Sequence, residues 1–165
     1  MISKKVCMLG SFSVGKTSLV RRFVDSIYSE AYHTTIGVKV DKKNVRVAGQ
    51  DLALVLWDIH GEDVFQKMRM SYLRGMSGYL LVADGTRQKT LEDAIALDER
   101  VRRELGEFPS VLALNKSDLA ADWEIDGERE RALASSGRPV ARTSAKTGES
   151  VEQVFQILAQ AILRT

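Results

Sequence analysis

The chain has 165 residues, of which 44% are hydrophobic, and we expect residues 1–165 to bury a core of ordinary size in a single domain. Its 24 basic and 22 acidic residues leave a net charge of +2, which argues against a general nucleic-acid-binding protein. One cysteine, Cys7, excludes an internal disulfide, and no signal peptide or membrane-spanning apolar run is visible. We therefore expect a cytoplasmic protein. The C-terminal residues ILRT contain no cysteine for a prenyl group, so no direct membrane anchor is expected.

Short apolar runs that end in polar or glycine-rich turns recur along the chain and predict strands buried on both faces. These runs are KKVCMLG (4–10), LALVLWD (52–58), GYLLVAD (78–84), SVLALNK (110–116) and RPVART (138–143). Residues 38–47 and the following AGQD predict a hairpin with the strand at 52–58, because the connection is too short for a crossover helix.

Apolar residues at helical spacing predict helices between these strands. They are Leu19, Val20, Phe23, Val24 and Ile27 in the first segment, Leu91, Ala94, Ile95 and Val101 in another, and Val151, Val154, Phe155, Leu158 and Ile162 in the last. Alternating strands and helices with one hairpin predict an α/β fold whose sheet is mostly parallel, with one antiparallel edge strand. Ligands bind beyond the carboxyl ends of the strands in such sheets, so the loops after residues 10, 58, 84, 115 and 143 are expected to converge.

The first predicted strand ends in GSFSVGKT, residues 10–17, which matches the phosphate-binding pattern GxxxxGKT. Glycines allow the backbone to wrap a polyphosphate, so that N–H groups and the following helix N-terminus face its charge. Lys16 is expected to reach the β- and γ-phosphates, and the Thr17 hydroxyl is expected to bind Mg²⁺. A strand and a helix flank the motif as it requires, which favours a polyphosphate site over a chance turn.

The sequence NKSD, Asn115 to Asp118, follows another predicted strand at the same edge. The Asp118 carboxylate can accept hydrogen bonds from N1–H and the 2-amino group of guanine, neither of which adenine offers. In the later tripeptide SAK, the backbone N–H of Ala145 is placed to reach guanine O6, while the stem of Lys116 packs along the ring. NKSD alone is also compatible with a surface turn. However, NKSD lies between the phosphate-binding motif and SAK along the chain and at the same edge of the predicted sheet, and this arrangement favours a guanine site.

Residues 58–61 form the pattern DxxG at a strand end. The Asp58 carboxylate can hold Mg²⁺ through a water, and the N–H of Gly61 can meet a γ-phosphate oxygen. Thr35, in the polar connection YHTTIG, is the natural second hydroxyl for the same ion. Loss of the γ-phosphate would release both segments, so these motifs predict a two-state switch.

With GSFSVGKT, TTIG, WDIHG, NKSD and SAK in this order over essentially the whole chain, the sequence resembles a Ras-superfamily small GTPase. TIGV, the WD before the glycine and SYLRGMSGYLLVADGT (71–86) are most similar to the Rab branch. The resemblance implies a P-loop G domain with a six-stranded sheet and five helices, with GTP or GDP and Mg²⁺ as ligands. It also implies switch I around residues 28–37 and switch II around residues 59–74.

The resemblance further implies a set of ligand-binding residues, in which Tyr28 matches the aromatic residue that leans on guanine. The nucleotide contacts are Ser11, Ser13, Val14, Gly15, Lys16, Thr17, Ser18, Tyr28, Thr35, Gly61, Asn115, Lys116, Asp118, Ser144, Ala145 and Lys146. The Mg²⁺ ligands are Thr17, Thr35 and Asp58, and the catalytic residues are Lys16, Gly61 and Glu62.

A monomer is expected, with effector and regulator proteins as partners that bind across Thr35, Val40, Trp57 and Tyr72. Trp57 and Tyr72 match two members of the aromatic surface of Rab-like proteins, whereas Val40 stands where those proteins have a third aromatic residue. A plain core role for Trp57 is the alternative.

Three residues depart from the family pattern, and all of them concern hydrolysis. The family usually has a glutamine after the DxxG glycine, where this chain has Glu62. A carboxylate can accept from the attacking water but has no N–H to donate, and it brings negative charge toward an anionic transition state. His60 replaces a small residue, and Phe12 places a ring in the P-loop, where it can crowd an entering arginine. The sequence therefore predicts slow hydrolysis or a rearranged geometry that uses His60, an outside activator, Arg69 or Arg74.

Three alternatives remain beside a slow GTPase. The first is a GTP-binding module that does not hydrolyse its nucleotide, and the second is a P-loop nucleotide kinase, against which NKSD and SAK argue. The third is a metal site made directly by Asp58, His60 and Glu62. Neighbouring positions of a loop rarely converge on one ion, and the chain has only two histidines, which disfavours this site.

Overall fold

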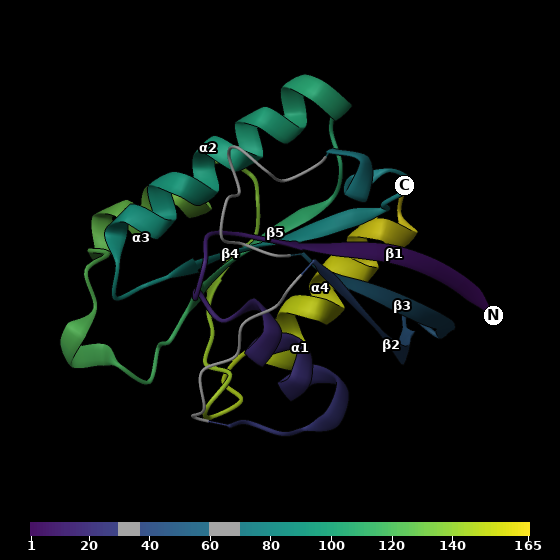
Figure 1. Ribbon diagram of the computed structural model, residues 1–165, viewed down its shortest axis with the longest axis horizontal. Helices are drawn as coiled ribbons and strands as arrows, with labels where there is room; N and C mark the ends of the chain where they lie inside the picture. Colours follow the sequence, from purple (N-terminus) through teal and green to yellow (C-terminus); the bar gives the residue numbers. More distant parts are fainter. Residues whose placement is uncertain (30–36, 60–69) are drawn as a thin grey trace.

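The computed structural model describes residues 1–29, 37–59 and 70–165, and their strands form one sheet in the order β2-β3-β1-β4-β5-β6 (Figure 1). The strands are β1 Ile2–Leu9, β2 Val38–Val47, β3 Gln50–Ile59, β4 Gly78–Asp84, β5 Ser110–Asn115 and β6 Val140–Arg142. The α-helices are α1 Lys16–Asp25, α2 Gln88–Leu105, α3 Gly127–Ala134 and α4 Val151–Leu163, with short 3-10 helices at Met70–Leu73 and Ala120–Asp122.

The strand directions confirm the predicted α/β fold. β1 runs parallel to β3 and β4, β5 runs parallel to β4 and β6, and only β2 pairs antiparallel, with β3, among the described residues. The β2–β3 hairpin turns at Ala48 and Gly49, whose φ values of 51° and 79° are those of a two-residue type I′ turn. The predicted antiparallel edge strand is therefore β2.

Alternate residues of the central strands pack into two separate apolar layers, because successive side chains of a strand point to opposite faces. Val6 and Met8 of β1 pack under α1 and α4, whereas Cys7 and Leu9 pack under α2. Figure 1 shows α1 and α4 on one side of the sheet and α2 on the other. Burial on both faces explains why β1 and β4 lack an alternation of polar and apolar residues.

Two sequence-based expectations differ from the structure in detail. We expected five helices, and the described residues contain four α-helices, with residues 60–69 of switch II outside the described part. The last strand was expected at residues 138–143 but spans only Val140–Arg142. Pro139 has no N–H to donate to the hydrogen-bond ladder of the sheet. The neighbouring Arg138 lies outside the strand, and its side chain donates to Ser110 and Asp98. Within the described part of the chain, no helix has the length and hydropathy to span a membrane.

Candidate functional site

The carboxyl ends of the parallel strands bring the predicted motifs together through direct hydrogen bonds. Asn115, at the end of β5, donates its Nδ2–H to the carbonyl of Val14 in the P-loop at 3.0 Å. Its Oδ1 accepts from the hydroxyl of Thr143, just after β6, at 3.0 Å. Asp58, near the end of β3, accepts from the Thr17 hydroxyl at 2.5 Å. Segments that lie far apart in the printed sequence thus meet at one edge of the sheet, as we predicted.

The P-loop between β1 and α1 depends on two glycines. A Cβ on Gly10 would lie 2.4 Å from the carbonyl oxygen of Val82, and one on Gly15 would lie 2.3 Å from Nδ2 of Asn115. Gly15 also has a φ of 104°, and it precedes α1 without a side chain that caps the helix. The first turn of α1 contains no acidic residue. The positive end of this helix therefore keeps its attraction for an anion, such as a phosphate group.

Lys16 lies across the P-loop with its side chain buried. Its Nζ donates to the carbonyl oxygens of Gly10 at 2.8 Å and Ser11 at 3.0 Å, and the residue is only 6% exposed. Burial lowers the pKa of Lys16 to about 8, against the opposing effect of the nearby Asp58 carboxylate. A buried cation within a cradle of backbone groups is suited to a strongly charged anion, which would stabilise the protonated amine.

Thr17 and Asp58 supply the donor types that Mg²⁺ prefers. The hydroxyl and the carboxylate are hydrogen-bonded to each other, and Asp58 is buried at the end of its strand. Both atoms are hard oxygen donors, and P-loop proteins hold Mg²⁺ with this pair of residue types. The donor set therefore fits the ion, while Thr35, the third predicted ligand, lies outside the described residues.

The predicted guanine-binding segments support one another through side chains. Ser144, which is buried, donates its hydroxyl hydrogen to Asp118 Oδ1 at 2.7 Å and accepts from the backbone N–H of Thr147. This contact orients the Asp118 carboxylate, whose residue is otherwise exposed. Ala145 is buried, whereas Lys146 is exposed and its carbonyl accepts from Arg22. The pairing of Ser144 with Asp118 thus links the SAK segment to the NKSD loop.

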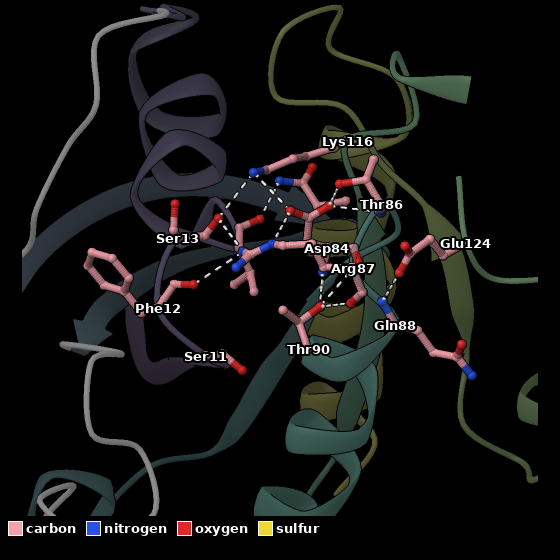
Figure 2. Close-up of polar contacts among 12 residues, drawn as sticks. Ser11, Phe12, Ser13, Asp84, Thr86, Arg87, Gln88, Thr90, Lys116 and Glu124 are labelled. Atoms are coloured by element: carbon pink, nitrogen blue, oxygen red, sulfur yellow. Dashed lines mark hydrogen bonds and ion pairs between the residues drawn. The ribbon is translucent and has the colours of Figure 1, made fainter. Parts of the chain in front are cut away.

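A further acidic residue, Asp84, lies at the end of β4 between the P-loop and the NKSD loop (Figure 2). Its Oδ1 accepts from the N–H and the hydroxyl of Thr86, and its Oδ2 pairs with Arg87 and Lys116, each at 2.9 Å. Burial raises the pKa of Asp84, but the hydrogen bonds from Thr86, Lys116 and Arg87 outweigh burial and hold this pKa below its ordinary value. We did not select Asp84 from the sequence, although an acid that ends a fully buried strand is a usable signal.

The loop after Asp84 is shaped by a close contact with Trp123. A Cβ on Gly85 would lie 2.0 Å from the indole ring, so only glycine allows the ring to pack there. The N–H of Gly85 donates to the carbonyl of Asn115, and the carbonyl of Gly85 accepts from Glu124. The β4–α2 loop is therefore fastened to the segment that follows NKSD.

Comparison with known proteins agrees with this arrangement. The sequence profile of the Ras family matches residues 5–164. The chain belongs to the Ras family. It is 36% identical to Ras-related protein Rab-1A of Dictyostelium discoideum and 34% identical to GTP-binding protein YPTM2 of Zea mays. Each similarity extends over 160 residues, which is 96% of this chain and 79% of the relative, and together they confirm the resemblance to Rab-like members of the superfamily.

Some residues that we predicted for this Ras-family site lie at its margin or outside the described part. The Ser11 hydroxyl donates to Asp93 of α2 at 3.1 Å, and Tyr28 is exposed beyond the end of α1. Ser18 is half-buried in the first turn of α1. Five predicted residues of the two switches are outside the described ranges, namely Thr35, His60, Gly61, Glu62 and Arg69.

Three described residues of the predicted partner surface lie on β2, β3 and the 3-10 helix Met70–Leu73 of this Ras-family chain. Val40 is 50% exposed and is paired in register with Trp57, whose ring is half-buried and has Lys5 Nζ 3.6 Å from its centre. Tyr72 is also half-buried and packs against the same apolar layer as Trp57. The ring of Trp57 thus contacts the core and also lies beside the exposed Val40.

Proposed function

We propose that this Ras-family chain is a guanine-nucleotide-binding switch that binds GTP and GDP with Mg²⁺ and hydrolyses GTP slowly. The convergence of the P-loop, Asp58, the NKSD loop and SAK at one sheet edge carries this proposal. Similarity to a relative named a GTP-binding protein supports it.

In this proposal the phosphate groups are bound by the backbone of the P-loop and by the protonated amine of Lys16. The contacts of that amine with Gly10 and Ser11 support this role, because they hold it within the loop. Bound Mg²⁺ supplies positive charge that offsets the charge of the phosphates. Thr17 and Asp58 hold the ion, together with Thr35 of switch I.

The base is held by the carboxylate of Asp118, which Ser144 supports, while Asn115 joins the P-loop to the end of β6. Asp118 accepts from N1–H and the 2-amino group of guanine, and Ser144 keeps one carboxylate oxygen in place. Adenine has no donor at the corresponding positions, so the carboxylate makes neither of these two hydrogen bonds, which is costly in a binding site.

Hydrolysis depends on Gly61 and Glu62 of switch II, together with Lys16. Gly61 donates its N–H to the γ-phosphate, Lys16 offsets the charge that develops on it, and Glu62 accepts a hydrogen bond from the attacking water. Glu62 has no N–H with which to stabilise the transferred group, and its negative charge opposes the transition state. These two effects are the reason for the slow rate that we propose, and a protein that retains GTP without hydrolysis is the limiting case.

The switch signals through its partner surface, to which we assign Thr35, Val40, Trp57 and Tyr72. Exposure of Val40 beside the half-buried ring of Trp57 supports this assignment, since the pair offers apolar area next to both switches. A monomeric, cytoplasmic protein that binds no nucleic acid remains the prediction for the free state.

The nucleotide that copurifies with the protein, identified by chromatography after denaturation, tests the base. We expect GDP or GTP, and an adenine nucleotide would contradict the proposal. Single-turnover decay of bound [γ-³²P]GTP then tests hydrolysis in wild type and in Glu62→Gln. Removal of the charge and gain of an N–H donor should accelerate decay at least tenfold, which corresponds to about 1.4 kcal/mol of transition-state stabilisation.

Glu99→Gln provides the matched control, because Glu99 is an exposed residue of α2 and the same charge is removed away from the site. Its decay rate should equal that of the wild type. Equal rates in wild type and Glu62→Gln would remove Glu62 from the explanation, and a rapid wild-type rate would refute slow hydrolysis. A total lack of decay would identify the limiting case, a GTP-binding module.

A further inference from the structure

Arg87, which directly precedes α2, reaches back to the P-loop (Figure 2). Its Nη2 donates to the carbonyl oxygens of Ser13 at 2.9 Å and Phe12 at 3.3 Å, while its Nε pairs with Asp84. The Ser13 carbonyl also accepts from Lys116 Nζ at 3.1 Å, and Lys116 is paired with the same oxygen of Asp84. One buried carboxylate therefore holds two cations, and both cations donate to one carbonyl of the P-loop.

Ser13, whose carbonyl accepts these hydrogen bonds, has an unusual backbone conformation. Ser13 has a φ of 63°, in the left-handed region that glycine adopts freely and other residues disfavour. The backbone preference of serine therefore does not keep the loop in this shape. The hydrogen bonds from Arg87 and Lys116 to the Ser13 carbonyl restrain the loop from outside instead.

Arg87 also controls the direction of two N–H groups. In a trans peptide the C=O and the N–H point in opposite directions, and the described residues contain no cis peptide. A restraint on the Phe12 carbonyl fixes the N–H of Ser13, and a restraint on the Ser13 carbonyl fixes the N–H of Val14. Both N–H groups are thereby directed away from the β4–α2 loop. They belong to the segment of the P-loop that wraps a polyphosphate.

We propose that Arg87 is a positioning residue for nucleotide retention, which acts through the P-loop backbone and compensates for the serine at position 13. The inference rests on the proposed binding of a guanine nucleotide. Arg87 orients the N–H groups of Ser13 and Val14 for the phosphates, and Asp84 holds the Arg87 guanidinium in place. Its role differs from that of an arginine that touches the γ-phosphate, because its guanidinium binds the carbonyl side of the loop.

The test is the dissociation rate of fluorescent mant-GDP, measured with Mg²⁺ and an excess of unlabelled GDP. Arg87→Gln should dissociate about tenfold faster than wild type. Arg87→Lys should lie between the two, because an ammonium retains the charge but lacks the fork that reaches Asp84 and the loop together. Arg46→Gln is the control, since Arg46 pairs with the exposed Asp51 at the hairpin end, and its rate should stay within twofold of wild type.

Two further readouts separate positioning from a general loss of stability. In a Ser13→Gly background the effect of Arg87→Gln should fall to threefold or less, because glycine adopts the left-handed conformation without a restraint. The ³¹P NMR resonance of the β-phosphate of bound GDP should shift in Arg87→Gln, with wild-type and Arg46→Gln resonances coincident.

The outcomes distinguish this inference from the function on which it rests. If wild type fails to retain mant-GDP, the proposed nucleotide function fails. If wild type retains it and Arg87→Gln dissociates at the same rate, only the role of Arg87 is overturned. If Arg87→Gln accelerates dissociation by the same factor with the native Ser13 and in the Ser13→Gly background, the proposed compensation for Ser13 is overturned.

Discussion

Asp84 shows how much of the site depends on a single residue. Its carboxylate is buried at the end of β4 and accepts from Thr86, Arg87 and Lys116. Arg87 restrains the phosphate loop and Lys116 belongs to the base loop, so one anion supports both parts of the site. A buried charge with several donors is stabilising only while all partners are present, because loss of one leaves the others with unpaired charge.

Replacement of Asp84 by asparagine should therefore destabilise the fold at neutral pH by about 2–4 kcal/mol. The folded-state pKa of Asp84 is held below its unfolded value, so its contribution is fully present above about pH 4, the unfolded value. That contribution is lost as the pH falls through the folded pKa. Urea unfolding at pH 7 and at several acidic pH values should show the gap between wild type and Asp84→Asn closing in acid.

Asp51→Asn is the matched control for this experiment. Asp51 is exposed and pairs with the exposed Arg46, so its replacement should cost less than about 1 kcal/mol at every pH. If the difference in unfolding free energy between wild type and Asp84→Asn stayed constant down to the lowest pH measured, the Asp84 carboxylate would not titrate as its hydrogen bonds imply.

At the scale of elements, the position of α1 follows from its packing on α4. The rings of Phe23 and Phe155 are stacked, with centroids 4.0 Å apart and planes 8° from parallel. Both residues belong to the apolar layer beneath β1 and β4. Because α1 begins at Lys16, directly after the P-loop glycine, this contact also fixes the helix whose N-terminus follows the P-loop.

Phe155→Leu should lower the free energy of unfolding by about 1–3 kcal/mol, because it removes an aromatic pair and leaves part of the ring volume empty. The midpoint of urea unfolding measures the loss, and an unchanged slope would show that the denatured state is unaffected. Ile157→Ala on the same helix provides the comparison. Ile157 is 40% exposed, so its truncation should cost less than about 1 kcal/mol, and an equal cost for both variants would deny the stack any special role.

At the scale of the whole molecule, the strands and their mostly parallel arrangement with one antiparallel edge strand were accessible from the sequence, because the signals for them are local. Runs of apolar residues marked the buried strands, the short AGQD connection marked the hairpin, and family motifs marked the strand ends. Helix α3 buries none of its residues and has no apolar stripe, so hydrophobic periodicity does not predict it. Pro139 shortened the last strand for a reason that also lies in the sequence.

The contacts between loops could not be predicted in the same way. Arg87 and Ser13 are separated by 74 positions, and their meeting depends on the order of β1 and β4 in the sheet. The left-handed backbone of Ser13 is equally invisible in the sequence GSFSVGKT, where serine suggests no such conformation. Residues whose roles arise from tertiary contacts, such as Asp84 and Arg87, were therefore missed, whereas only residues within motifs were selected.

The candidate site lies at the carboxyl ends of five strands of one sheet, so the nucleotide that we propose as its ligand should stabilise the whole fold. With GDP at about 100 times its dissociation constant and Mg²⁺ present, linkage predicts about 2.7 kcal/mol of added stability, or roughly 5–10 °C in melting temperature. EDTA should remove a large part of this shift. Thr17→Ala should reduce the GDP-induced shift in melting temperature in the presence of Mg²⁺ and make that shift insensitive to EDTA. A wild-type shift that is unchanged by EDTA would contradict the Mg²⁺ site.

The pairing of Arg87 and Lys116 with the single carboxylate of Asp84 has a consequence for the association rate of the nucleotide. Arg87 and Lys116 carry two positive charges against the one negative charge of Asp84, so this cluster beside the phosphate loop has a net positive charge although the whole chain is nearly neutral. A polyphosphate approaching from solution is attracted by this local field over about 8 Å at physiological ionic strength. Added salt would therefore slow the arrival of the nucleotide more than its departure, since departure is governed by short-range contacts within the loop.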